Sequence, residues 1–264
     1  MGTLQMKLNN LKAEIKELNS LIVSYSGGTD STLLGVLAHQ ALGDSVECVI
    51  INSPLMPEYE FESAVLVAEE LDLPLKVLNS DILNEPDFSK NTKDRCYICK
   101  KSNAALLRAE AERLGFLNIA DGTNFDDTKV FRPGYRAGCE EGIKHPFADC
   151  MITKDDIRNI AKEYNLKNHD KPSSSCLATR IPYDTKLSEE SLYLIEKAED
   201  IIRNYGVSQL RVRELYGSAR IEVAQSDMPV ILKNKENISK KLKKLGFLYI
   251  TLDLDGFVSG SMDR

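Results

Sequence analysis

Residues 21–31 run Leu21-Ile22-Val23-Ser24-Tyr25-Ser26-Gly27-Gly28-Thr29-Asp30-Ser31. This stretch decides the fold. The apolar run at 21–25 predicts a buried strand, and the apolar spacing over 32–42 predicts a helix after a short turn. Two adjacent glycines let the backbone approach an anion closely, and the start of a helix offers unpaired N–H groups with a partial positive charge. The stretch therefore predicts a phosphate-binding loop, with an ordinary Gly-Gly turn as the alternative.

Strands and helices are expected to alternate after this loop, which predicts right-handed crossovers and a parallel sheet covered on both faces. The expected strands are 46–51, 75–78 and 116–120, and the expected helices are 4–18, 58–71 and 100–114. A capping box at Thr153-Lys154-Asp155-Asp156 predicts one more helix, ending near Tyr164. The predicted class is α/β.

A smaller α+β domain is expected beyond a polar connection at 169–176. Its expected helices are 188–204 and 229–245, and its expected strands are 209–215, 219–223 and 247–252. The predicted boundaries are therefore 1–168 for a nucleotide-binding domain and 169–264 for a domain that binds substrate or forms oligomers. The connection carries Cys176.

Composition limits the partners. A net charge of -6 disfavours a nucleic-acid substrate, because such binding draws on basic residues. The lysines at 233–244 have helical spacing, which is typical of a solvated helix face. No apolar run approaches the roughly 20 residues of a membrane span, and the N-terminus lacks the pattern of a signal peptide. We expect a cytoplasmic protein with no membrane partner.

A second loop follows the strand expected at 116–120, so it should lie at the same sheet edge as the phosphate loop. Its aspartates could bind magnesium and its backbone could shape an adenine pocket, although an exposed acidic turn is the alternative. Arg132 offers a fixed guanidinium for a phosphate or carboxylate. The residues predicted to bind the nucleotide outside the phosphate loop are Ser53, Asp121, Gly122, Asp127 and Arg132.

Three cysteines suggest metal or sulfur chemistry. Cys96 and Cys99 precede the helix expected at 100–114 and have the two-residue gap that lets both thiolates reach one metal. With Cys176 they would leave one coordination position open for an exogenous ligand. A redox pair or unrelated cysteines is the alternative. Cys48 sits in an expected strand and is interpreted as an inert core residue.

The loop Ser26-Gly27-Gly28-Thr29-Asp30-Ser31 resembles that of the PP-loop ATP pyrophosphatases, whose domain is adenine nucleotide α-hydrolase-like. The resemblance implies an enzyme that splits ATP between its α and β phosphates and adenylates a substrate. Ser26, Gly28 and Ser31, with Gly27 between them, would then hold pyrophosphate. Asp30 would lie near Mg²⁺.

The chain also resembles the LarE family of sulfur transferases over nearly its whole length. The matching segments are 26–31, 121–122, 132–134, 176–183, 211–213, 220–222 and 251–257. The resemblance implies adenylation of pyridinium-3,5-biscarboxylic acid mononucleotide and its conversion to a thiocarboxylate, in nickel-pincer nucleotide biosynthesis for lactate racemase. It also implies a homo-oligomer, and the resemblance suggests six chains.

Two versions of this family's chemistry predict different cysteines. Sacrificial members lose the sulfur of one cysteine in the loop that corresponds to 173–180. Cys96 and Cys99 are additional here, so the chain resembles the subgroup in which three cysteines hold a [4Fe-4S] cluster that carries an extra sulfide. We favour the cluster version, which requires a sulfide donor.

Basic residues are the candidates for gripping the substrate. Arg211 and Arg213 occupy alternate positions of an expected strand and should face one side, where they could bind a phosphate, although a pair of surface charges is the alternative. Arg180, and less strongly Lys100, could steady a carboxylate or acyl phosphate. The remaining candidates, for a further cation or for substrate positioning, are Glu199 and Glu222, and solvent contacts are the alternative for both.

Other functions remain open from the residues alone. A tRNA thiolase of the PP-loop superfamily also uses three cysteines, but the acidic composition disfavours it. An amide-forming synthetase needs no cysteine cluster. A noncatalytic nucleotide-binding regulator would leave Cys96, Cys99 and Cys176 unexplained.

Overall fold

A computed structural model describes residues 2–130, 132–172, 174–207 and 209–258. Ser173, within the loop assigned above to sulfur delivery, lies outside them. The chain forms two compact units. Unit 1 comprises residues 1–82 and 94–174, and unit 2 comprises residues 83–93 and 175–264.

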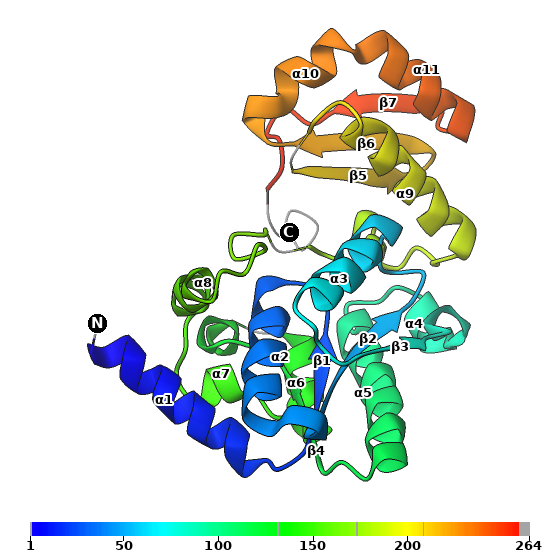
Figure 1. The fold of residues 1–264 in the computed structure, drawn as a ribbon. Coiled ribbons are helices and arrows are strands. Elements are labelled where there is room, and N and C mark those ends of the chain that lie inside the picture. The colour runs from blue at the N-terminus through cyan, green and yellow to red at the C-terminus, as the bar shows by residue number, and fades with distance from the viewer. Residues whose placement is uncertain (1, 131, 173, 208, 259–264) are drawn as a thin grey trace. The chain divides into compact units, whose positions relative to one another are not determined.

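Unit 1 contains a parallel sheet with the strand order β3-β2-β1-β4 among the described residues (Figure 1). The strands are β1 (Leu21–Tyr25), β2 (Val46–Asn52), β3 (Leu75–Asn79) and β4 (Asn118–Asp121). In the register, Val23 of β1 lies between Cys48 of β2 and Ala120 of β4. The parallel α/β class is confirmed, because these strands are joined by helices.

Both faces of the central strand β1 are buried. Leu21, Val23 and Tyr25 pack into a large core with α1 (Gly2–Glu17), α2 (Thr29–Leu42), α3 (Glu58–Glu70) and α8 (Lys154–Glu163). Ile22 points to the other face, where it packs with Leu107 of α5 (Arg95–Leu114). Since successive side chains of a strand alternate between faces, a strand covered on both sides is mostly apolar, and Ser24 is the one exception in β1.

Helix α5 begins five residues earlier than the spacing predicted, so Cys96 and Cys99 lie in its first turn and not before it. The stretch Cys96-Tyr97-Ile98-Cys99 has weak intrinsic helix propensity, which favoured the later start. Packing overrides that preference, because α6 (Pro133–Glu140) lies against this turn. A Cβ on Gly134 of α6 would be 3.7 Å from the carbonyl oxygen of Cys96.

Unit 2 is built on a mixed sheet with the order β5-β6-β7 in the described part of the chain. A hairpin joins β5 (Leu210–Leu215) to antiparallel β6 (Ser218–Val223), and β7 (Tyr249–Leu252) runs parallel to β6. The helices are α9 (Glu189–Arg203), α10 (Met228–Lys233) and α11 (Lys235–Leu245). The single helix predicted over 229–245 is interrupted at Asn234, whose side chain donates to the carbonyl of Val230.

Residues 83–93 fold with unit 2 although they come from the first third of the chain. They contain α4 (Pro86–Ser89) and a fully buried Asn91, whose side-chain amide donates to the carbonyls of Ile181 and Pro182. The backbone amide of Leu187 donates to the carbonyl of Ser89. The segment thus completes unit 2, which the sequence did not indicate.

Of the helices described, none has the length and apolar character needed to cross a membrane.

Candidate active site

The phosphate loop turns sharply between β1 and α2 at Gly27. Gly27 has a positive φ of 69°, and a Cβ built on it would lie 2.3 Å from the Cβ of Ala64 in α3. Only glycine fits this combination of backbone conformation and close approach. Gly28 follows in an extended conformation as the N-cap of α2, and a Cβ there would meet nothing closer than the Ser26 hydroxyl at 3.5 Å.

The two serines of the loop face each other. The Ser26 and Ser31 hydroxyl oxygens are 3.1 Å apart, and the Ser31 hydroxyl also accepts from the Ser26 backbone amide. Together with the first amides of α2, these hydroxyls form a set of donors at the carboxyl end of β1. Such an arrangement suits a phosphate group, because both the hydroxyls and the helix N-terminus favour negative charge.

Asp30 is held from two sides. The Lys154 amine at the start of α8 forms an ion pair with it, and the Asn124 amide donates to its other oxygen at 3.1 Å. Asn124 also donates to Asp127, whose second oxygen pairs with Arg132 at 2.8 Å. The predicted residues Asp30, Asp127 and Arg132 thus belong to one network beside the loop.

The backbone of Gly122 lies directly against the start of α2. A Cβ on Gly122 would be 2.9 Å from the amide nitrogen of Ser31, so a side chain there would displace the phosphate loop. The preceding residue, Asp121, accepts from Lys100 at 2.5 Å and pairs with His145 at 2.8 Å. Burial alone would raise the pKa of Asp121, but His145 and Lys100 lower it well below its ordinary value.

The structure therefore brings the first turn of α5 close to the phosphate loop within unit 1. Lys100 follows Cys99 directly and reaches Asp121, and Gly122 touches the amide of Ser31. Cys96 is exposed and Cys99 is partly buried on that turn, with the amide of Asn103 3.8 Å from the Cys99 sulfur. Ser53 follows β2, and its backbone carbonyl accepts from the amide of Met56.

Sequence reasoning missed three of these residues. Asn124 and Lys154 orient Asp30, and His145 is buried against Asp121. The Nε2 of His145 has no hydrogen-bond partner among the described residues. Lys154 lay inside a recognised capping box, but nothing in that local pattern indicates a contact with residue 30. These contacts depend on chain segments that meet only after folding.

In unit 2, the loop that carries Cys176 is held by Arg180. The Arg180 side chain is fully buried, and one of its nitrogens donates to the carbonyls of Ser175 and Cys176 at 2.7 and 3.0 Å. Its other nitrogens bind Glu199, the closer pair at 2.9 Å, and the same carboxylate accepts from the amide of Val212. Arg180 therefore fixes the backbone around Cys176 and joins it to α9 and β5.

A second buried ion pair lies beside this loop. Arg213 binds Glu222 through two nitrogens and donates to the carbonyl of Thr179 at 2.7 Å. Arg220 binds the other oxygen of Glu222 at 2.8 Å. Arg211 is also buried, with its guanidinium 5.1 Å from the Phe257 ring centre. The predicted substrate-binding residues of unit 2 are thus buried and paired, not solvent contacts.

The described residues contain no group of three or more His, Cys, Asp and Glu side chains arranged to hold a metal ion. Cys96 and Cys99 belong to unit 1, and Cys176 belongs to unit 2. Cys48 lies in β2, where burial raises the pKa of its thiol to about 12. That environment suits an inert core thiol.

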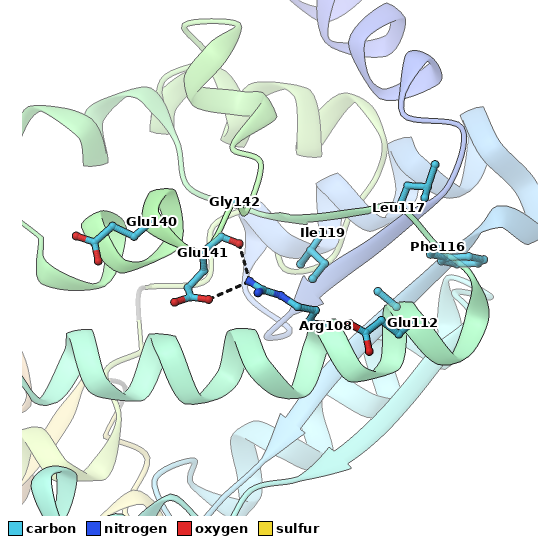
Figure 2. A pocket seen from close by; sticks show the side chains of 9 residues that line it. Arg108, Glu112, Phe116, Leu117, Ile119, Glu140, Glu141 and Gly142 are labelled. Atoms are coloured by element: carbon cyan, nitrogen blue, oxygen red, sulfur yellow. Dashed lines mark hydrogen bonds and ion pairs between the residues drawn. The ribbon is translucent and has the colours of Figure 1, made fainter.

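A separate cavity lies at the other end of the sheet in unit 1. Figure 2 shows Arg108 of α5 reaching across it to Glu141, with Phe116 and Leu117 at the beginning of β4. The phosphate loop follows the carboxyl end of β1, which is parallel to β4. The cavity therefore does not belong to the nucleotide site.

The parallel sheet and its Ser-Gly-Gly loop define a PP-loop nucleotide-binding enzyme. Consistent with this class, residues 4–109 match the NAD synthase family. The chain is 35% identical over its whole length to pyridinium-3,5-bisthiocarboxylic acid mononucleotide synthase of Lactiplantibacillus plantarum, covering 96% of that protein. The chain therefore belongs to the same family as this mononucleotide synthase, the LarE family of ATP-dependent sulfur transferases.

Two further relatives extend over most of the chain. An uncharacterized protein of Methanocaldococcus jannaschii is 38% identical over 94% of this chain and 94% of its own length. An uncharacterized protein of Synechocystis sp. is 34% identical over 99% of this chain and 98% of its own length. The similarity therefore includes both units and not the nucleotide-binding region alone.

Proposed function

We propose that this enzyme adenylates a carboxylate of pyridinium-3,5-biscarboxylic acid mononucleotide and replaces it with a thiocarboxylate. The substrate is inferred from the name of the full-length Lactiplantibacillus relative. The observation that carries the proposal is the direct contact of Gly122 with the phosphate loop, next to Asp121 and Lys100. It supports a connection, within unit 1, between ATP binding and the cysteine-bearing turn.

The first step joins the substrate to AMP. A carboxylate oxygen attacks the α phosphorus of ATP, and the bond to pyrophosphate breaks. Ser26, Ser31 and the first amides of α2 would hold the departing pyrophosphate. Asp30 and Asp127, which pair with Lys154 and Arg132, would supply carboxylate oxygens of the type that Mg²⁺ prefers. AMP is a better leaving group than oxide, so a sulfur nucleophile can then attack the acyl carbon.

Cys96, Cys99 and Cys176 are proposed to hold a [4Fe-4S] cluster, which would supply an additional sulfide at the remaining iron. The thiols of Cys96 and Cys99 lie three residues apart in the first turn of α5, so they share one helix face. These features fit two ligands of such a cluster, with the third supplied by unit 2.

Arg180 is proposed to act as a positioning residue for Cys176, because its buried guanidinium holds the backbone of Ser175 and Cys176. Arg211 and Arg213 are proposed to bind the phosphate of the substrate, with Glu222 fixing Arg213 and Glu199 fixing Arg180. Residues 1–168 are proposed to bind ATP, and residues 169–264 are proposed to bind the substrate and form oligomers. A cytoplasmic homo-oligomer and a separate sulfide donor complete the proposal.

The test compares two variants under anaerobic conditions. Gly28→Ala should fold, because the added methyl meets nothing closer than 3.5 Å, but it blocks close approach of phosphate. It should keep the visible absorption of a cluster and lose substrate-dependent AMP release. Cys176→Ala should lose the absorption and keep AMP release. A colourless wild-type protein reconstituted with iron and sulfide would contradict the cluster proposal.

Two rival activities give different outcomes in the same assay. A tRNA thiolase would release AMP in response to tRNA and not to the pyridinium mononucleotide. Sacrificial sulfur transfer would convert Cys176 to dehydroalanine in a single turnover, which intact-protein mass spectrometry detects. Repeated turnover with an unchanged protein mass, when sulfide is resupplied, is the result that we expect.

A further inference from the structure

We propose that Asn168 is a positioning residue that couples nucleotide binding at the phosphate loop to the placement of the Cys176 loop. The proposal rests on the proposed function, because it assumes that the loop binds ATP and that Cys176 takes part in sulfur transfer. It assigns a role to Asn168, Lys171 and Ser174 of unit 1, where the sequence indicated only a polar connection at 169–176.

Asn168 makes three hydrogen bonds to the phosphate loop and the start of α2. Its side-chain amide donates to the carbonyl of Gly27 at 3.2 Å and to the Thr32 hydroxyl at 3.0 Å. Its backbone carbonyl accepts from the Thr29 hydroxyl at 2.6 Å. The carbonyl of Gly27 can only accept, which fixes the orientation of the Asn168 amide.

Burial strengthens this connection. Asn168 is 8% exposed, Thr29 is 3% exposed and Thr32 is fully buried. A buried hydrogen bond is costly to break when one partner remains unsatisfied. A shift of the Gly27 turn on phosphate binding must therefore either carry Asn168 along or break these bonds. The side-chain oxygen of Asn168 has no partner among the described residues, so the side chain bonds to the loop through its amide N–H groups alone.

A second anchor holds the following residues to α3. The Lys171 amine lies 2.6 Å from the carboxylate of Glu60, and the side chain of Ser174 also bonds to Glu60. Burial would raise the pKa of Glu60, but Lys171, with Tyr59 and Ser174, lowers it below its ordinary value. Glu60 lies one turn from Ala64, which touches the Gly27 turn. The contacts of Asn168 and those of Lys171 therefore both connect this segment to the phosphate loop.

The short distance along the chain between Ser174 and Cys176 transmits this restraint to the cysteine. Ser174 belongs to unit 1, and Cys176 is two residues further along the chain. Two extended residues span at most about 7 Å, so the position of Ser174 limits the position of Cys176. Nucleotide binding that tightens the Gly27 turn should therefore restrict the connection that leads to Cys176. By linkage, restricting that connection should equally favour nucleotide binding.

Hydrogen exchange measures this coupling directly on the anaerobic holoenzyme. Exchange is followed by mass spectrometry in peptides from the phosphate loop (26–34) and from the connection (166–180), with and without a nonhydrolysable ATP analogue. In the wild-type enzyme we expect the analogue to slow exchange in both peptides. In Asn168→Ala, we expect slowing in the phosphate loop and, in the connection, a response reduced about fivefold or more, because the substitution removes both side-chain hydrogen bonds and loss of one typical bond already implies about fivefold.

A second pair of variants separates a lost hydrogen bond from a fold defect. Thr32→Val keeps the shape of the side chain and removes the acceptor for Asn168, so it should weaken the coupling. Thr32→Ser keeps the hydroxyl, so it should keep the coupling at the wild-type level. Lys167→Ala is the matched control, because Lys167 forms an exposed ion pair with Glu70 immediately beside Asn168. It should leave the response of both peptides unchanged.

Activity provides an independent readout. Asn168→Ala should lower the rate of thiocarboxylate formation about fivefold or more beyond any loss of ATP–pyrophosphate exchange, because the substitution also acts on the connection to Cys176. A residue with a merely structural role would lower both rates together. Equal losses in the two reactions would therefore overturn the proposal.

Other outcomes are also decisive. If the analogue binds the wild-type enzyme and the connection does not respond, or if Asn168→Ala responds like the wild type, the coupling is wrong. If the analogue does not bind, the nucleotide site and the coupling both fail. If the coupling is present and no thiocarboxylate forms, the coupling stands and the proposed substrate fails.

Discussion

Single residues set the phosphate loop, and Gly27 is the clearest case. We expect Gly27→Ala to destabilise the protein by about 2–4 kcal/mol, because the new methyl group would overlap Ala64 and the backbone would have to keep a positive φ. Gly115→Ala is the matched control. Gly115 has a similar φ of 70°, and an added Cβ would meet no described atom within 4 Å. Urea unfolding should show a cost of only about 1 kcal/mol for the control.

The ion pair of Glu60 and Lys171 predicts a particular dependence of stability on pH. Because the pKa of Glu60 is lower in the folded protein than in the unfolded chain, the carboxylate stabilises the fold fully above its ordinary pKa of about 4.3. That contribution is lost as the pH falls through the lowered, folded-state value.

The stability difference between the wild type and Glu60→Gln should therefore be constant from neutral pH down to about pH 5 and then narrow. Urea unfolding at a series of pH values measures it. A difference that widens on acidification would contradict the direction of the shift. A difference that changes between pH 6 and 8 would point to another titrating group.

At the scale of elements, the strands of unit 1 were predictable because their burial pattern is local. Residues 21–25 and 46–51 are apolar except for Ser24 and Glu47, and the structure places β1 and β2 there. Adjacent glycines let the backbone approach an anion closely, so the phosphate loop could be predicted from its own residues. These features need no knowledge of distant parts of the chain.

Other elements could not be predicted from local sequence. The early start of α5 depends on packing against α6, and the membership of residues 83–93 in unit 2 depends on contacts with residues more than 80 positions away. Asn124, His145, Lys154 and Asn168 likewise have no local signal, because each meets its partner only in the folded chain. Their roles require coordinates.

Asn91 tests the role of the 83–93 segment. Asn91→Ala should destabilise unit 2 by about 2–3 kcal/mol, because it removes the donor to the carbonyls of Ile181 and Pro182. Asn165→Ala is the control, since Asn165 is exposed and has a φ of 55°, close to the 57° of Asn91. Equal losses for the two variants in urea unfolding would show that backbone strain, and not the buried bonds, accounts for the effect.

At the scale of the whole molecule, ligand binding should identify the unit that contains the nucleotide site. ATP with Mg²⁺ at about 100 times its dissociation constant should stabilise the folded protein by about 2.7 kcal/mol. Thermal unfolding should show this rise in the wild type and not in Gly28→Ala. Hydrogen exchange should place the protection in unit 1. Protection confined to unit 2 would contradict the assignment of the phosphate loop.

The discontinuous composition of unit 2 has a consequence for synthesis. Residues 83–93 leave the ribosome long before residues 175–258, yet their buried partners, such as the carbonyls of Ile181 and Pro182, are in the later segment. The nascent chain must therefore keep Asn91 solvated until the second half has been translated. A gene fragment that begins at residue 175 would encode a unit that lacks part of its own interior.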